Sequence, residues 1–268
     1  ETARLAHVVL PAASWLEKDG TKTNTERRVQ LLTPVLAAPG QALPDWQIVC
    51  ALGARLDEKL GRVEPGQANR WQFASTAAIM DEIARVSPIY GGIQHRRLAG
   101  AGLVWPCPDP QHPGTPILHT QRFTRGLGKF HAVGFHPSAE LPDEEYPFLL
   151  NTGRQMYHWH TGTMTRRSFA LDAREPGPTV ELHPDDAREL GVQDGDEVLV
   201  ASRRGEITVS VRLSTRVARH QVFIPMHYRE GAVNVLTNPE LDPYAHIPEF
   251  KVCAVRVTPV AQAARRDL

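Results

Sequence analysis

The chain has 268 residues, 41% of them hydrophobic, which is enough apolar material for one large folded domain or two of ordinary size. Its 30 basic and 30 acidic side chains cancel, which argues against an overall field that attracts nucleic acid or an anionic membrane, so any anion site must be local. We find no apolar run of about eighteen residues and no signal-peptide pattern. We therefore expect a soluble protein, cytoplasmic unless an upstream segment carries a targeting signal.

The first residues predict that this chain is a piece of a longer protein. It begins with Glu1 rather than Met, and ETARLAHVVLPAASW leads directly into an apolar run at residues 8–10 that Pro11 ends. Such a run, stopped by proline, is typical of a buried strand that leaves a sheet at a loop. The following EKDGTKTNTERRVQLL predicts a polar loop and a returning strand.

Two helices are predicted in the next part of the chain. The first covers residues 44–56, where proline suits the first turn and Trp46, Val49, Cys50 and Leu56 recur on one face. The second covers residues 76–86 and should end at a serine that precedes a proline. The rest of residues 61–142 is rich in Gly, Pro and His, and we interpret it as connective, with a hairpin turned at residues 126–128.

From Tyr146 onward the pattern changes to short strands. We expect them at YPFLLNT, VELH, VLVAS, EITVSVRL, QVFIPMHY and VCAVRVTPV, with one short helix at PDDARELG. The acidic residues Asp185, Asp186 and Glu189 belong to this helix, where acids complement the helix dipole, and we interpret them as structural. Short strands at close spacing with one small helix favour a compact β-barrel.

Residues 146–171 carry the strongest sign of a ligand site. They contain no Asp or Glu, yet they include three arginines, two histidines, several hydroxyl side chains and glycines that let backbone N–H groups approach a ligand. Arg154 follows a predicted strand directly, where its guanidinium could bind a pyrophosphate through paired hydrogen bonds. Either this segment binds a large polyanion or it is a basic, solvated loop.

The three cysteines do not form a metal-binding pattern. Cys50, Cys107 and Cys253 are far apart and lack CxxC or Cys/His spacing, so we expect them to be buried core residues. No residue of the chain is predicted to be a metal ligand or a catalytic group.

Three long segments carry a family resemblance. They are VLPAASWLEKDGTKTNTERRVQ, NTGRQMYHWHTGTMTRRS and LTNPELDPYAHIPEFKVCAVRV. In this order, over nearly the whole chain, they resemble the bis-molybdopterin guanine dinucleotide oxidoreductases, and among these the large (alpha) subunit of formate dehydrogenase. The segment HWHTGTMTRR is also similar to the nitrate-reducing branch of the same superfamily.

The resemblance implies a fold and a cofactor. Residues 1–141 would be the end of the α/β molybdopterin oxidoreductase domain plus a connective segment, an α/β remnant. Residues 142–268 would be a mostly β dinucleotide-binding domain, a six-stranded double-psi barrel of the aspartate-decarboxylase type. The cofactor would be bis-molybdopterin guanine dinucleotide with molybdenum or tungsten, and an iron–sulfur cluster would belong to an absent N-terminal part. The implied cofactor-binding residues are Thr152, Gly153, Arg154, Gln155, Met156, Tyr157, His158, Trp159, His160, Thr161, Met226, Asn234 and Lys251.

Three functions follow from this resemblance. The chain would be part of a formate dehydrogenase, which converts formate to carbon dioxide and sends two electrons to iron–sulfur centres, or part of a related nitrate reductase. It could instead be a stand-alone molybdopterin-binding or assembly module, although half an α/β unit in residues 1–58 argues against this. The expected partners are the remainder of the large subunit and iron–sulfur or flavin electron-transfer subunits, with formate as substrate, no nucleic acid and no direct membrane insertion. Because the metal-ligand motif is absent, we expect the chain alone to be inactive.

Overall fold

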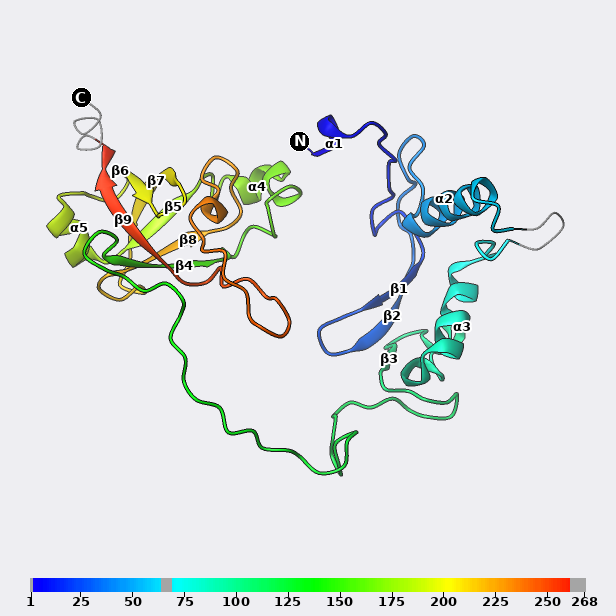
Figure 1. The fold of residues 1–268 in the computed structure, drawn as a ribbon. Coiled ribbons are helices and arrows are strands. Elements are labelled where there is room, and N and C mark those ends of the chain that lie inside the picture. Colours follow the sequence, from blue (N-terminus) through cyan, green and yellow to red (C-terminus); the bar gives the residue numbers. More distant parts are fainter. Residues whose placement is uncertain (1, 64–68, 261–268) are drawn as a thin grey trace. The chain divides into compact units, whose positions relative to one another are not determined.

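The chain folds into two compact units, Glu1–His131 and Ala132–Leu268 (Figure 1). A computed structural model describes residues 2–63 and 69–260. The two units are described separately below.

The first unit contains a small antiparallel sheet and two main helices. The strands β1 (Gly20–Thr23), β2 (Arg28–Leu32) and β3 (Leu103–Val104) lie in the order β1-β2-β3. The helices are α1 (Thr2–Leu5), α2 (Asp45–Lys59) and α3 (Thr76–Val86), and the 3-10 turns are η1 (Pro88–Tyr90) and η2 (His95–Arg97). A small core is built from Val29, Met80, Ile93, Leu98 and Cys107.

Both predicted helices are present, and they differ in how well they are covered. Helix α3 has the predicted bounds, and its N-terminus is capped by Ser75, whose hydroxyl accepts a hydrogen bond of 3.2 Å from the N–H of Ala78. Helix α2 is longer than predicted, and Pro44 precedes it instead of opening its first turn. The predicted apolar face of α2 is open to solvent, since Val49 is 54% and Leu56 56% exposed.

The prediction of a buried strand at residues 8–10 was wrong. Val8, Val9 and Leu10 are 73%, 59% and 48% exposed, and the only pairing nearby is a single bridge between Ala12 and Leu43. Among the described residues this run pairs with no strand, although the three-stranded sheet of the same unit is open. Its backbone groups therefore stay in water, where they remain hydrogen-bonded.

The prediction that residues 61–142 are connective was wrong for their first half. Beyond α3, residues 88–116 include η1, η2 and β3 and supply three of the core residues, among them Cys107, which is completely buried. The Arg97 guanidinium binds the backbone carbonyls of Gly92 and His112 at 2.5 and 2.7 Å. Core positions scattered between Gly and Pro have no period of two or 3.6, so periodicity did not reveal them. The hairpin predicted at residues 126–128 is reduced to one bridge between Phe123 and Gly126.

The second unit is a closed six-stranded barrel with the order β4-β8-β5-β7-β6-β9, so the predicted fold class is confirmed. Its strands are β4 (Phe148–Gly153), β5 (Thr179–Leu182), β6 (Glu197–Ala201), β7 (Glu206–Leu213), β8 (Gln221–Pro225) and β9 (Cys253–Pro259). The pairs β4–β8 and β5–β7 are parallel, and the other four are antiparallel. Closure leaves no free sheet edge. Short helical segments are η3 (Thr165–Arg167), α4 (Phe169–Asp172), α5 (Pro184–Leu190) and η4 (Val233–Val235).

Alternation along the strands separates the core from the outer face. Leu150, Val180, Leu182, Val222 and Ile224 all have zero exposure and fill the barrel interior. The residues between them on the same strands point outward.

The three acids of α5 are structural, as predicted. Asp186 is 1% exposed and accepts hydrogen bonds from the Arg219 guanidinium and from the backbone N–H of His220. Glu189 pairs with the same arginine at 2.6 Å, and Asp185 pairs with Arg188 at 2.9 Å on the helix surface. Asp186 and Glu189 thus attach α5 to the turn before β8, while Asp185 pairs within the helix.

Candidate functional site

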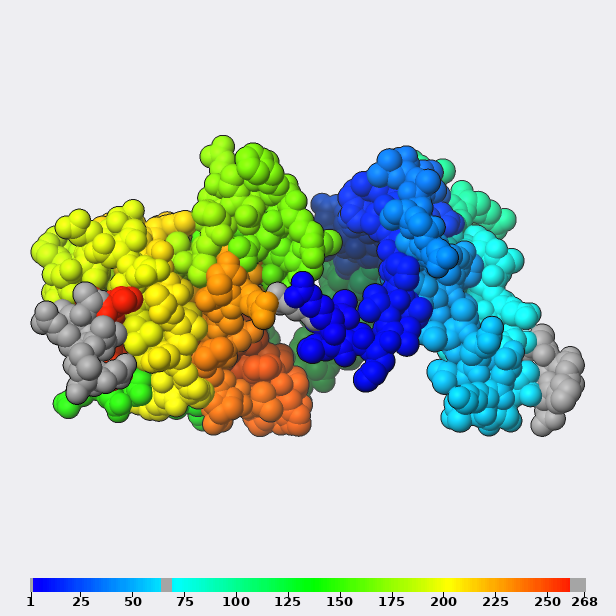
Figure 2. Space-filling model, turned by 90° about the horizontal axis from the view of Figure 1, so that it is seen from above, coloured from blue at the N-terminus to red at the C-terminus, as the bar shows by residue number. Residues whose placement is uncertain are grey.

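The segment of residues 154–178 leaves the barrel at the end of β4 and returns at β5. In the space-filling view it stands out from the barrel (yellow-green) beside the segment that follows β8 (orange) (Figure 2). Arg166 joins these two segments, because its guanidinium pairs with Asp172 at 3.2 Å and with Glu230 at 2.7 Å. We call residues 154–178 the site loop.

Two buried rings organise the inside of the site loop. His158 is 4% exposed, and its Nδ1 and Nε2 lie 3.0 Å from the Thr165 hydroxyl and 2.7 Å from the Glu175 carbonyl oxygen. Tyr228, which follows β8, donates its hydroxyl proton toward that same carbonyl and toward the Gln155 side-chain oxygen. Burial raises the pKa of Tyr228 to about 12, so this hydroxyl remains a donor.

His227 fixes the first residues of the site loop. It is 1% exposed, its Nε2 accepts a hydrogen bond of 2.8 Å from the backbone N–H of Gln155, and its Nδ1 is bonded to the His160 carbonyl oxygen. The accepting nitrogen must be unprotonated, so the ring is neutral with its proton on Nδ1. Burial away from water lowers the pKa of His227, which favours this neutral form. His227 therefore supports the loop from inside and does not line its outer wall.

The opposite side of the site loop faces solvent. Met156 is 90% and Trp159 53% exposed, and the exposed Arg154 guanidinium lies 5.2 Å from the centre of the Trp159 ring. His160, in a left-handed conformation with φ 48°, and Thr161 are also exposed. Among the described residues no carboxylate pairs with Arg154, whereas Arg166 is paired with acids and Arg167 binds the Thr163 carbonyl. This surface presents an unpaired cation, an aromatic ring and several hydrogen-bonding groups.

The other predicted binding residues lie in two places. At the end of β4, Thr152 is buried, and its carbonyl accepts a hydrogen bond of 2.9 Å from the Lys251 ammonium. Gly153 follows, and its carbonyl accepts from the N–H of the half-buried Met226 at 2.9 Å. Asn234 is exposed in η4. The structure thus brings Lys251 and Met226 to the end of β4, and among the described residues no hydrogen bond or ion pair joins the Asn234 side chain to the site loop.

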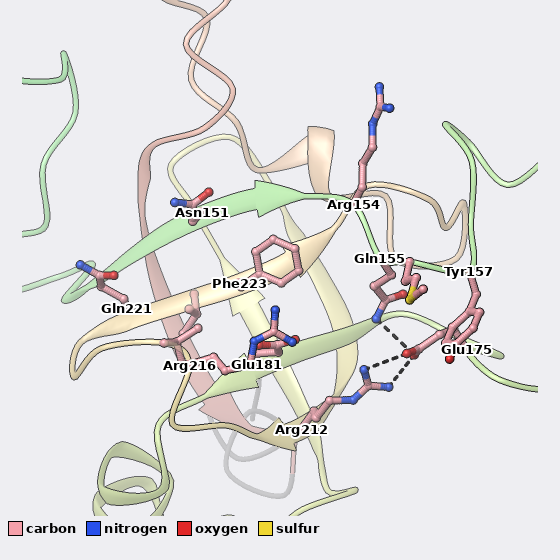
Figure 3. A pocket seen from close by; sticks show the side chains of 13 residues that line it. Asn151, Arg154, Gln155, Tyr157, Glu175, Glu181, Arg212, Arg216, Gln221 and Phe223 are labelled. Carbon is pink, nitrogen blue, oxygen red and sulfur yellow. Dashed lines mark hydrogen bonds and ion pairs between the residues drawn. The ribbon is translucent and has the colours of Figure 1, made fainter. Parts of the chain in front are cut away.

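A pocket of about 660 Å³ lies beside the first residues of the site loop, on the outer face of the barrel. Figure 3 shows Glu175 on its wall, paired with Arg212 at 2.6 Å and with the Gln155 amide at 3.3 Å, while Arg154 points away from the pocket. The pocket is lined by Asn151, Arg154, Gln155, Met156, Tyr157, Glu175, Glu181, Arg212, Arg216, Val217, Gln221, Val222 and Phe223.

None of the pocket residues outside the site loop was predicted from the sequence. Asn151, Glu181, Arg212 and Phe223 occupy outward positions of four different strands, and each looks like an ordinary solvent-facing residue in its own segment. Their outward direction follows from the alternation of each strand. The closure of the barrel decides which strands are neighbours, and the alternation within one strand gives no information about this closure.

The described residues offer no metal centre. No group of three His, Cys, Asp or Glu side chains among them is arranged to hold a metal ion. Burial raises the pKa of the Cys253 thiol to about 11, and Cys107 is fully buried, so both behave as core residues, as predicted. Within the same residues, no helix has both the length and the apolarity needed to cross a membrane. The chemistry available at the site loop is binding through cations, backbone groups and rings.

Comparisons with known proteins connect this surface to a cofactor. Residues 148–254 match the family model described as molydopterin dinucleotide binding domain, and residues 1–55 match the model described as molybdopterin oxidoreductase. The chain is 48% identical to a formate dehydrogenase subunit alpha of Methanocaldococcus jannaschii, over 96% of this chain and 37% of that protein. It is 39% identical to the assimilatory nitrate reductase catalytic subunit of Bacillus subtilis, over 97% of this chain and 37% of that protein.

A solved structure shares the fold. Acetylene hydratase from Pelobacter acetylenicus superposes with a TM-score of 0.64 and 17% sequence identity, covering 96% of this chain and 39% of that chain. The chain therefore spans a little over a third of the length of the relatives that it matches.

Proposed function

The chain carries a molybdopterin dinucleotide-binding domain and part of a molybdopterin oxidoreductase domain and so belongs to the molybdopterin oxidoreductases; from this we propose that it is the C-terminal region of a formate dehydrogenase large subunit. The complete enzyme would oxidise formate to carbon dioxide and pass two electrons to iron–sulfur centres. The share of this region is to bind and orient bis-molybdopterin guanine dinucleotide, whose molybdenum or tungsten supplies the redox chemistry when the cofactor is bound.

The single observation that supports this role best is the outward surface of the site loop. A pyrophosphate-bridged dinucleotide needs cations that are not already neutralised, and Arg154 has no carboxylate partner among the described residues. It also needs hydrogen-bonding groups and flat apolar surface, which His160, Thr161 and Trp159 provide. The residues present fit the cofactor in charge and chemistry.

The proposed binding residues divide into two groups by burial. Arg154, Met156, Trp159, His160 and Thr161 face outward and would touch the cofactor directly. The second group lies in the loop and at its base, and its members would act mainly through the backbone or by holding the first group in place. Asn234 and Lys251 would add further contacts to the cofactor. This second group consists of Thr152, Gly153, Gln155, Tyr157, His158 and Met226.

We further propose the following organisation for the complete protein. Residues 1–141 would close the α/β domain that begins upstream, and residues 142–268 would form the dinucleotide-binding domain. The partners would be the remainder of the large subunit and iron–sulfur or flavin electron-transfer subunits, in the cytoplasm. The many exposed apolar side chains of the first unit, such as Val8, Val9 and Leu52, suit a surface that more of the same polypeptide covers.

Nitrate reductase is the second candidate, because the Bacillus subtilis nitrate reductase subunit aligns over the same 97% of the chain. The higher identity of 48% to a formate dehydrogenase subunit favours formate. The purified full-length enzyme should reduce an artificial electron acceptor when given formate, and it should not oxidise a reduced viologen when given nitrate. Nitrate-dependent oxidation without formate turnover would overturn the proposed substrate.

The stand-alone module is tested by size and by activity. We expect a native polypeptide several times the 29.7 kDa of this chain by intact mass, and no formate turnover by the purified 268-residue chain supplied with metal and pterin. A native mass near 29.7 kDa would favour the module instead. Formate turnover by the chain alone would show that a catalytic group lies within it.

A further inference from the structure

Four outward side chains form a straight row across four strands of the barrel. In the strand register Asn151 of β4 is opposite Phe223 of β8, Phe223 is opposite Glu181 of β5, and Glu181 is opposite Arg212 of β7. Partners in register point to the same side of a sheet. The order across the outer face is therefore amide, aromatic ring, carboxylate, guanidinium, and this row is the floor of the pocket in Figure 3.

The aromatic ring of this row rests on a glycine. A Cβ atom added to Gly153 would lie 2.6 Å from the Phe223 ring, which is closer than real contacts allow. Because position 153 has no side chain, the ring can lie against β4. Phe223 is only half-buried and lines the pocket, so it offers a flat surface to a planar ligand.

The carboxylate beside this ring lacks a partner. Glu181 is only 9% exposed, and among the described residues no hydrogen bond or ion pair reaches its carboxylate. Its neighbour in register, Arg212, uses both terminal nitrogens on Glu175 instead, at 2.6 and 3.3 Å. The Glu181 oxygens are not among the fully buried unpaired atoms of the described residues, so they reach the pocket that Glu181 lines and are available to a ligand that brings N–H groups.

The row indicates what kind of ligand the pocket would bind. It offers the flat ring of Phe223, the unpaired carboxylate of Glu181 on one side and the amide of Asn151 on the other. The ligand should be a planar heterocycle that carries two adjacent N–H donors on one edge. We propose that Glu181 accepts hydrogen bonds from the two N–H groups of a 2-amino-4-oxopyrimidine ring, the unit that guanine and pterin share, while the ring lies against Phe223. Guanine and pterin both occur in the dinucleotide of the proposed function. The inference rests on the proposed function for this choice of ligand.

The roles of the residues follow from their positions. Glu181 would select the edge of the ring through charge-assisted hydrogen bonds, and Phe223 would hold its face. Asn151 would meet the far edge, since an amide can both donate and accept. Arg216, which lines the same pocket, would meet an attached phosphate.

Two ligand pairs that differ by one amino group test this assignment. The full-length polypeptide, isolated from a host that cannot make the pterin cofactor, would be titrated calorimetrically with guanosine or inosine monophosphate, and with pterin or lumazine. Inosine monophosphate has hydrogen in place of the 2-amino group, and lumazine has a carbonyl oxygen there, which the Glu181 carboxylate would repel. We expect the aminated member of at least one pair to bind at least about tenfold more tightly, since a charge-assisted hydrogen bond is lost without it. The pair that shows the preference identifies the guanine or the pterin end.

Glu181→Gln should remove this preference, because an amide has one acceptor oxygen and turns an N–H donor toward the ligand. Glu206→Gln, at the exposed start of β7, is the matched control and should keep it. Equal binding within both pairs by the wild type, a preference that survives Glu181→Gln, or its loss in Glu206→Gln would overturn the proposal. If Glu181→Gln fails to fold, the wild-type comparison alone decides, because a site without carboxylate recognition binds both members of each pair equally.

This result is separable from the test of the proposed function. That function depends on retention of the whole cofactor through the guanidinium of Arg154, which points away from the pocket that the rest of this residue lines. A wild type that discriminates guanosine from inosine monophosphate supports the Glu181 site even if substitution of Arg154 leaves cofactor content unchanged.

Discussion

The barrel and the first unit bury apolar side chains to very different extents. The barrel gathers eighteen buried residues into one cluster, whereas the first unit has a cluster of five and exposes large side chains such as Val8, Leu52 and Leu56. The barrel also closes its sheet, while the described residues of the first unit form an open sheet of three short strands. A closed barrel satisfies its own hydrogen bonds and core, so its stability should be intrinsic, and that of the first unit should depend on further protein surface.

The largest expected effect follows from separating the two units. Residues 132–268, expressed alone, should unfold in one cooperative transition with a stability in the ordinary range of about 5–15 kcal/mol. Residues 1–131, expressed alone, should show no cooperative transition, because a core cluster of five buried residues cannot offset the conformational entropy of the chain. Urea denaturation followed by circular dichroism measures both. A sharp transition in residues 1–131 would contradict the comparison.

Two leucine substitutions compare the burial of single side chains in the barrel and in the first unit. Leu182→Ala removes a side chain with zero exposure from the barrel core and should cost roughly 2–5 kcal/mol. Leu52→Ala removes one that is 49% exposed on α2 and should change the free energy of unfolding by less than about 0.5 kcal/mol. Denaturant midpoints of the two variants of the 268-residue chain provide the measurement. Similar losses in both would show that Leu52 is already buried within this chain.

The difference between the regular barrel and the irregular first unit explains which parts of the fold could be predicted from the sequence. All six barrel strands and α5 were predicted, because inward and outward residues alternate along them, as in EITVSVRL of β7. The run at residues 8–10 has strand-like composition, but a strand also needs a partner, and sequence composition cannot supply one. The core at residues 88–116 depends on contacts between irregular segments, for which no period exists.

A smaller effect concerns His227, which joins the barrel to the site loop. Its folded-state pKa lies below the ordinary value of 6.5 because it is buried, so below pH 6.5 the unfolded chain binds a proton that the folded chain does not. Stability should therefore fall as the pH drops below 6.5, by at most about 1.4 kcal/mol per pH unit from this group, and should be flat above it.

The charged and titratable groups around His227 are His158 and His160 of the site loop, Arg154 at its start and Tyr228 beside it. His227→Leu should be less stable at neutral pH and should lose the part of the pH dependence that this imidazole causes. Thermal melting between pH 5 and 8 checks this. An unchanged pH dependence in the variant would show that other groups cause it.

The site was predictable in part. The composition of residues 146–171 left two interpretations open, an anion site or a basic solvated loop, and the resemblance favoured the first. The exposure of Trp159 agrees with a surface that is open to a ligand. The sequence could not show that His158 is buried with both ring nitrogens bonded, since its neighbours Thr165 and Glu175 are brought to it by the path of the loop. It also could not show the row through Phe223 and Glu181, which exists only because β8 lies beside β5.

The most direct test compares two arginines of the barrel unit in the full-length subunit. Arg154→Ala removes the unpaired guanidinium of the site loop, a charge-assisted contact of roughly 1.5–3 kcal/mol to the cofactor, and leaves cofactor charge unpaired. Arg188→Ala removes a guanidinium that is 77% exposed on α5 and pairs only with Asp185 among the described residues. Molybdenum or tungsten content and pterin content should fall together in Arg154→Ala and stay at the wild-type level in Arg188→Ala. Full metal and pterin occupancy in both variants would contradict the assignment of the site loop to the dinucleotide.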